Sequence, residues 1–166
     1  NIFIVIEFMV FRMNIKKHKA FEFWKEKMGD TKHNIHCNAV IKSCINMTTN
    51  TKMEPEIFII AGWIHDMGKL INKKNHHIES LKYLDEFLHK NDKYKKWIKE
   101  LKDCILNHRG GGNPKTIYGL IFKCADKVAL YDNNWLKKYE LSFSEILDRD
   151  ARHQRFCILR SASSIH

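Results

Sequence analysis

The segment from Glu56 to Met67 constrains the fold most, because it is apolar on nearly every side. Its apolar residues are Ile57, Phe58, Ile59, Ile60, Ala61, Trp63 and Ile64. A helix that is hydrophobic all round has to be buried by other elements. Pro55 suits the first turn of such a helix, and Gly68 is expected to end it. The segment therefore predicts a central helix around which the rest of the chain packs.

The segments on either side also have helical periodicity, and strand signals are scarce. Asp30 and Thr31 are expected to cap a helix whose apolar face carries His36, Val40, Cys44 and Met47. Three later segments are also expected to be helices with an inward apolar face. The first face consists of Ile78, Leu81, Leu84, Phe87 and Leu88, and the second of Tyr94, Trp97, Ile98, Leu101, Cys104, Ile105 and His108. The third consists of Ile117, Leu120, Ile121, Cys124, Ala125 and Val128. The fold class is therefore predicted to be all-α.

A chain of 166 residues fits one domain, and it has no internal repeat or linker that would divide it. We expect a single domain over residues 13–147, with 1–12 and 148–166 as peripheral segments. Four of the six arginines crowd into the last 18 residues, so the tail is interpreted as belonging to a different coding context. The apolar stretch 1–11 is too short to span a bilayer and lacks the basic start of a signal peptide, so no membrane association is expected.

The formal net charge of +10 leaves two interpretations open. A basic surface can attract phosphate-bearing ligands, from nucleotides to nucleic acid, or it can simply keep a protein soluble. One charge run, Lys95, Lys96, Lys99 and Lys102, is interpreted as the solvated face of a helix rather than a nucleic-acid patch.

The five cysteines are widely spaced and contain no C-x-x-C pair, which indicates a reducing compartment, with the cytoplasm as the expected location. We expect three of them, Cys44, Cys104 and Cys124, to serve as small buried hydrophobic residues.

The run from Ala61 to Lys69 carries the chemistry. Its His-Asp-x-Gly-Lys pattern at residues 65–69 has a chance expectation of roughly three in a thousand for this composition. His65 supplies a neutral nitrogen and Asp66 an anionic oxygen, a pair that suits a divalent first-row metal ion. A second carboxylate oxygen is left over, so Asp66 could bridge to a second ion. The alternative for this pair alone is an ordinary helix end with its own hydrogen bonds.

Two more residues stand in otherwise apolar helical segments. His36 alone would more often be a satisfied core histidine than a ligand. Asp126 needs a partner if it is buried, because an unpaired buried charge is very costly. Either a metal ion or a lysine salt bridge could supply that partner.

The order of these residues resembles the HD superfamily of metal-dependent phosphohydrolases. The matching segments are His36-x-x-x-Val40, the His-Asp-x-Gly-Lys run, and Ala125-Asp126-Lys127, and the resemblance covers about residues 30–131. It implies a compact bundle of five core helices with peripheral segments. It also implies one metal ion held by His36, His65, Asp66 and Asp126.

Further histidines resemble the branch of this superfamily that holds two metals. His76 lies four residues before Ser80, as in that branch, and is favoured over its neighbour His77. His108 matches the position of the last extra ligand. The resemblance thus implies one or two divalent first-row ions (Fe, Mn, Co, Ni or Zn), with His76, His108 and Asp66 holding the second. The alternatives are an exposed polar loop for the histidine pair and a helix-end cation for His108.

The expected function is hydrolysis of a phosphomonoester or phosphoanhydride, with a nucleotide-type substrate as the partner. Asp66 and Lys69 are the expected catalytic residues, and Lys69, Arg109 and Lys127 are expected to bind the phosphate. Three rivals remain open: a nuclease of the same superfamily acting on single-stranded nucleic acid, a di-iron oxygenase with the same ligand set, and a non-catalytic ligand-binding module. Neither the oligomeric state nor the choice of metal follows from the residues.

Overall fold

The computed structural model describes residues 15–29 and 31–131 of the chain. Within these ranges it contains six α-helices and four short 3-10 helices and no strand, which confirms the all-α prediction. In chain order the elements are η1 (Ile15–Lys17), α2 (Lys19–Met28), α3 (His33–Met47), α4 (Pro55–Ile64), η2 (Met67–Leu70), α5 (His76–Lys90), η3 (Asp92–Trp97), α6 (Ile98–Asn107), α7 (Ile117–Val128) and η4 (Ala129–Tyr131).

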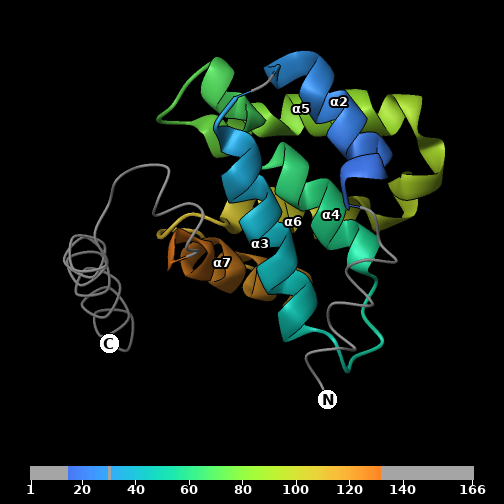
Figure 1. Cartoon of the computed structure of the whole chain (residues 1–166), viewed down its shortest axis with the longest axis vertical. Coiled ribbons are helices and arrows are strands. Elements are labelled where there is room, and N and C mark those ends of the chain that lie inside the picture. Colours follow the sequence, from blue (N-terminus) through green and yellow to red (C-terminus); the bar gives the residue numbers. More distant parts are fainter. Residues whose placement is uncertain (1–14, 30, 132–166) are drawn as a thin grey trace.

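The predicted central helix is α4, and every residue from Ile57 to Ile64 is buried. Figure 1 shows α4 beside α3 in the middle of the molecule, with α6 behind them and α7 crossing at the lower left. Pro55 stands in the first turn, where its missing N–H costs nothing. Gly62 lets α3 and α4 approach closely, because a Cβ there would lie 2.2 Å from Cγ1 of Ile41. The five core helices are therefore α3 to α7.

The outer layer is made by α2, which packs against α4 and also contacts α5, where Phe23 meets Phe87 with ring centroids 5.6 Å apart. Trp24 of α2 meets Trp63 of α4 with ring centroids 5.3 Å apart. Phe21 meets the same Trp63 at 4.8 Å. The helix begins after His18, whose Nδ1 accepts a hydrogen bond from the backbone N–H of Ala20. This peripheral helix thus covers one side of the central helix with aromatic surface.

Some helix boundaries differ from the prediction. The central α-helix ends at Ile64, and the chain continues through His65 and Asp66 into the 3-10 helix η2. The segment from Tyr94 starts as 3-10 helix, and α6 begins only at Ile98. The expected cap of α3 is wrong for Thr31, because Lys32 takes the cap position and no side chain caps the helix. Asp30 lies outside the described residues.

Several inward faces are also corrected. Met47, Ile78 and Ile98 are exposed rather than buried. On α7 the prediction is confirmed for Ala125, which is buried, and for Ile121, which packs against the core, but it is wrong for the four exposed residues Ile117, Leu120, Cys124 and Val128. The buried residues of that helix are Gly119, Phe122, Ala125 and Asp126. The buried side of α7 includes the carboxylate of Asp126, so the side that meets α3 and α6 is not the fully apolar side that periodicity indicated.

Of the lysine run, Lys95, Lys96 and Lys99 are exposed and Lys102 is partly so, which agrees with the solvent exposure expected of these side chains. Two of these ammonium groups pair with carboxylates, Lys95 with Asp92 at 2.6 Å and Lys102 with Asp85 at 3.7 Å. Among the described helices none is both long and apolar enough to cross a membrane. The proposed limits of the domain, residues 13 and 147, lie outside the described residues, as do both peripheral segments.

Candidate metal centre

The turn that carries His65 and Asp66 is fixed against the first turn of α5. The hydroxyl of Ser80 donates to the carbonyl of His65 at 2.7 Å and accepts from the N–H of Gly68 at 2.8 Å. Gly68 itself touches backbone, because a Cβ there would lie 2.1 Å from the carbonyl oxygen of His76 and 2.6 Å from the nitrogen of Ser80. The lack of a side chain at Gly68 therefore brings His76 next to the His-Asp turn.

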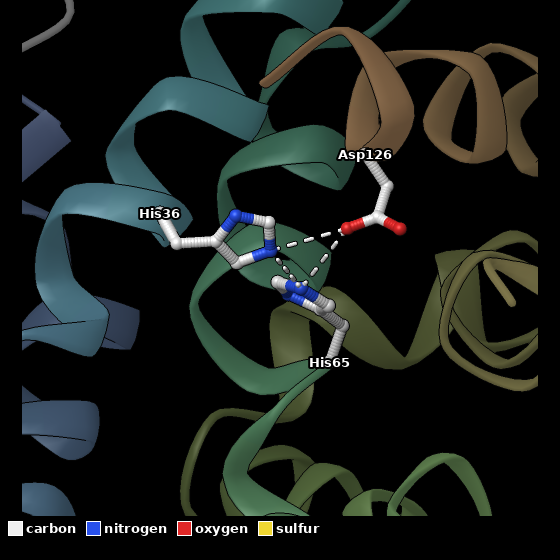
Figure 2. Close-up of side chains that lie close together, drawn as sticks. All are labelled: His36, His65 and Asp126. Atoms are coloured by element: carbon white, nitrogen blue, oxygen red, sulfur yellow. Dashed lines mark hydrogen bonds and ion pairs between the residues drawn. The ribbon is translucent and has the colours of Figure 1, made fainter. Parts of the chain in front are cut away.

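One group of potential ligands joins α3, the end of α4 and α7. Nε2 of His36 lies 3.1 Å from Oδ1 of Asp126 and 3.3 Å from Nε2 of His65. Nε2 of His65 lies 3.7 Å from the same Asp126 oxygen. Figure 2 shows the three side chains pointing toward one another from their three elements. These atoms are close enough together to hold one metal ion.

A second group forms around the other side of Asp66. Nε2 of His76 lies 3.0 Å from Nε2 of His108 and 3.3 Å from Oδ1 of Asp66. Nε2 of His108 lies 3.9 Å from that Oδ1 atom. The other oxygen, Oδ2, lies 3.6 Å from Nε2 of His65 and 3.7 Å from Nε2 of His36. The two oxygens of Asp66 thus face two different groups of imidazoles.

A comparison with known protein families shows to which family the chain belongs. The HD domain family matches residues 35–131, which is more than half of the chain. The chain belongs to the HD domain family. No curated protein and no solved structure matches it. Membership confirms the resemblance and places the protein in a superfamily of metal-dependent hydrolases.

The donor atoms of this HD site suit a divalent metal ion. The Nδ1 atoms of His65, His76 and His108 each lie 2.7–2.9 Å from the carbonyl oxygen of the residue three positions earlier. An N–H donated there leaves the Nε2 lone pair aimed into the site. Two nitrogens bound to one ion at about 2.1 Å and near a right angle lie about 3 Å apart, close to the spacings found here.

His36 is the exception among the four histidines of the HD site. Its Nδ1 atom is buried and has no hydrogen-bond partner among the described residues. In the other three histidines, a hydrogen bond from Nδ1 to a backbone carbonyl orients the ring. The ring of His36 lacks this bond and is therefore the least constrained of the four.

The protonation states of the HD site are those that ligands require. Burial alone would raise the pKa of Asp66, but His65, Lys69 and His36 together hold it well below its usual range. Burial likewise opposes ionisation of Asp126, and the hydrogen bond and charge of His36 outweigh it and lower that pKa. Burial lowers the pKa of His65, and it lowers the pKa of His108 to about 3. At neutral pH the carboxylates are therefore ionised, while these two imidazoles are neutral.

The HD site opens into a cavity of about 320 Å³. Five of the six expected ligands line it, all except the fully buried His65: His36, Asp66, His76, His108 and Asp126. Lys69, Arg109 and Lys127, the three residues expected to bind phosphate, line it as well. Lys69 donates to Oδ2 of Asp66, and Nζ of Lys127 lies 3.3 Å from Oδ2 of Asp126. Both lysines thus stand beside ligand carboxylates, where they offset negative charge.

Arg109 and His77 lie at the edge of the HD site. Nη1 of Arg109 donates to the carbonyl of Lys74 at 2.7 Å and lies 3.3 Å from Nδ1 of His77. This contact joins the end of α6 to the loop before α5, the two segments that carry His108 and His76. His77 does not line the cavity, whereas His76, the favoured member of the pair, lies there with the other proposed ligands.

Three residues that line the cavity, His33, Gly110 and Leu130, were not among the expected site residues. His33 stands one helical turn before His36 on α3 and lines the same cavity. Its pKa is lowered by burial and by the nearby charge of Lys69. The spacing of three residues from His36 was a signal that could have found it. Leu130 of η4 also lines the cavity, and no feature of the sequence marked it.

Proposed function

We propose that this HD domain is a two-metal phosphohydrolase that cleaves a phosphomonoester or phosphoanhydride of nucleotide size. The observation that carries the proposal is the position of Asp66, whose Oδ2 faces His65 and His36 while its Oδ1 faces His76 and His108. A carboxylate shared in this way can bind two ions at once. His36, His65 and Asp126 would hold one ion, and His76 and His108 the other.

The residues of the chain prepare this site before any ion binds. Burial keeps His65 and His108 neutral, so that their Nε2 lone pairs are available without loss of a proton. Bound metal ions would supply the Lewis acidity needed to activate a water molecule at neutral pH and to offset charge on the phosphoryl oxygens. Asp66 acts as the shared ligand, and its hydrogen bond to Lys69 ties the metal centre to the cavity rim.

The cavity supports a small phosphate-bearing substrate. Its volume of about 320 Å³ is at the lower end of the range typical of small-molecule sites. Lys69 and Lys127 are each about one third exposed, so their ammonium groups can reach an anionic group that enters. The ammonium groups at the rim, together with metal ions bound at the ligands, would hold a phosphate by its oxygens.

The test is metal content followed by phosphate release. Protein purified without chelator is expected to hold one to two first-row divalent ions per chain and to release phosphate from at least one nucleotide or small phosphate ester. Asp66→Ala should lose more metal than any other single variant and should be inactive, because the two oxygens of Asp66 face one pair of imidazoles each. Full metal content and full activity in Asp66→Ala would contradict the proposal.

The rival functions are separated by the same preparation. Cleavage of single-stranded oligonucleotides without release of phosphate from small esters would indicate a nuclease. Turnover that consumes oxygen and stops under anaerobic conditions would indicate an oxygenase. Tight metal binding with no turnover of any phosphate compound would indicate a non-catalytic module. No described contact favours one of these rivals, so none is proposed beside the hydrolase.

A further inference from the structure

The outward face of α7 is entirely apolar. Its exposed residues are Ile117, Leu120, Cys124 and Val128, spaced by three, four and four positions. Ile117 is 57% exposed, Leu120 50% and Val128 48%. The two lysines of the helix are turned away from this face: Lys123 donates to the carbonyls of Gly110 and Gly112, and Lys127 contacts Asp126. At 1.5 Å per residue, the stripe is about 17 Å long.

The outward face of α2, another helix at the surface, is polar instead. The exposed residues of α2 are all charged: Lys19, Glu22, Lys25 and Glu26. A polar outward face of this kind is typical of a surface helix, whereas a helix that is apolar on every side is normally buried. A contiguous apolar stripe on a folded domain marks a surface that another element or partner covers. None of the described residues covers the stripe of α7.

We propose that the segment immediately downstream, residues 135–147, packs on this stripe and completes the domain. The chain leaves α7 through η4, so the segment starts within a few residues of the stripe it would cover. Residues 132–134 are Asp-Asn-Asn, a composition suited to a tight connection. Two antiparallel helices are commonly joined by a connection of about two to five residues.

The downstream segment has the apolar pattern that such packing needs. Its large apolar residues include Trp135, Leu136, Tyr139, Phe143, Ile146 and Leu147. On a helix, all six would fall within an arc of about 120°. The charged residues Lys137, Lys138, Glu140 and Glu145 would fall outside that arc. Thirteen helical residues span about 20 Å, which matches the length of the stripe.

A second copy of the chain is the competing occupant. The covalent connection favours the segment, because an occupant tethered by a few residues is present at an effective concentration of about millimolar. The proposal concerns the extent of the folded domain and does not depend on the hydrolase activity proposed above. It also agrees with the expectation that the domain extends to residue 147.

Cys124 lies on the stripe and reports whether it is covered. The full chain would be treated with a maleimide, and the rate of labelling at Cys124 followed by mass spectrometry. In Tyr139→Ser/Phe143→Ser, which removes two apolar side chains from the segment, labelling should be at least about tenfold faster than in the unaltered chain. The matched control Lys137→Ser/Lys138→Ser changes only charged positions and should label as slowly as the unaltered chain.

A second measurement works without weakening the packing. In full chains carrying Cys157→Ser, the substitutions Trp135→Cys, Tyr139→Cys, Phe143→Cys and Ile146→Cys would be introduced one at a time and tested for an intramolecular disulfide with Cys124. At least one should form it readily, and the controls Lys137→Cys and Lys138→Cys should not. Rapid labelling of Cys124 in the unaltered chain, with no cross-link from any apolar position, would overturn the proposal. Protection that rises with protein concentration would overturn it in favour of a second copy.

Discussion

Asp66 concentrates the chemistry of this HD domain in one side chain. Each of its oxygens lies within 4 Å of two imidazole nitrogens, and Oδ2 also accepts a hydrogen bond from Lys69. The carboxylate is buried, so it is costly to ionise unless positive partners surround it. A divalent ion on either side would supply that charge directly, and Lys69 supplies part of it from the rim.

The neighbouring histidines His76 and His77 are expected to behave differently. His76→Ala and His108→Ala should each remove about half of the bound metal, because both imidazoles face Oδ1 of Asp66. His77→Ala should leave metal content unchanged, since His77 contacts Arg109 and does not line the cavity. Elemental analysis of the three variants makes the comparison, with His77→Ala as the matched control. Equal metal content in all three would show a mononuclear site.

Lys69 is expected to affect substrate rather than metal. Lys69→Ala should lower kcat/KM by roughly ten- to a hundredfold, because a lost charged hydrogen bond is worth about 1.5–3 kcal/mol. Metal content should stay as in the unaltered protein, since other residues supply all the proposed ligands. Lys82→Ala, which removes an exposed lysine paired with Glu79, is the control. Unchanged kinetics in Lys69→Ala would show that Lys69 does not bind the substrate.

Among the elements, the contact between η2 and α5 decides whether the second group of ligands can form. The hydroxyl of Ser80 connects the carbonyl of His65 to the N–H of Gly68, and Gly68 lies against the backbone of His76. The His-Asp turn and the first turn of α5 therefore hold each other in place. Arg109 adds a link from the end of α6 to the loop before α5.

A methyl group at Gly68 should separate these elements. In Gly68→Ala the new Cβ would meet backbone atoms at 2.1 and 2.6 Å, which cannot move aside as a flexible side chain would. We expect a loss of about 1–3 kcal/mol in the free energy of unfolding. We also expect loss of the metal that His76 helps to hold. Denaturant unfolding and elemental analysis measure the two effects.

Ile71→Ala is the control for this variant, because it changes an exposed residue just beyond the same 3-10 helix. It should leave both the unfolding free energy and the metal content close to those of the unaltered protein. A fully stable Gly68→Ala with normal metal content would show that η2 and α5 can separate without harm to the site.

For the whole molecule, buried neutral histidines link folding to pH. Burial and the charge of Lys93 lower the pKa of His18 from 6.5 to about 4, and Glu22 offsets only part of this shift. Between these two values the unfolded chain takes up a proton that the folded chain does not. Folding should therefore lose stability as the pH falls from about 6.5 to about 4.

This loss can be measured on metal-free protein, so that metal release does not contribute. We expect His18 to account for about 1–2 kcal/mol of it, after allowance for its partial exposure to solvent. His18→Asn keeps an acceptor for the N–H of Ala20 and cannot titrate, so its unfolding free energy should depend less on pH in this range. Parallel pH profiles for the two proteins would contradict this role of His18.

The order of the helices from α3 to α7 followed from local patterns, whereas α2 was not predicted. Apolar residues on all sides predicted the buried α4, with Pro55 at its start, and the His-Asp-x-Gly-Lys run predicted a metal pair at its end. Both depend on residues close together in the chain, where helical geometry fixes the spacing. The preference for His76 over His77 rested on a spacing of four residues to Ser80, and the structure places His76 in the cavity.

Only the tertiary structure decided which faces meet. Helix α7 buries Asp126 at the metal centre and leaves part of its apolar side exposed, so its buried side was set by its contacts with α3 and α6 rather than by its own periodicity. The same holds for the HD site. Its six proposed ligands are spread over residues 36–126, and only packing brings the two oxygens of Asp66 between two pairs of imidazoles. His33 and Leu130 join the cavity for the same reason: distance along the chain does not determine distance in space.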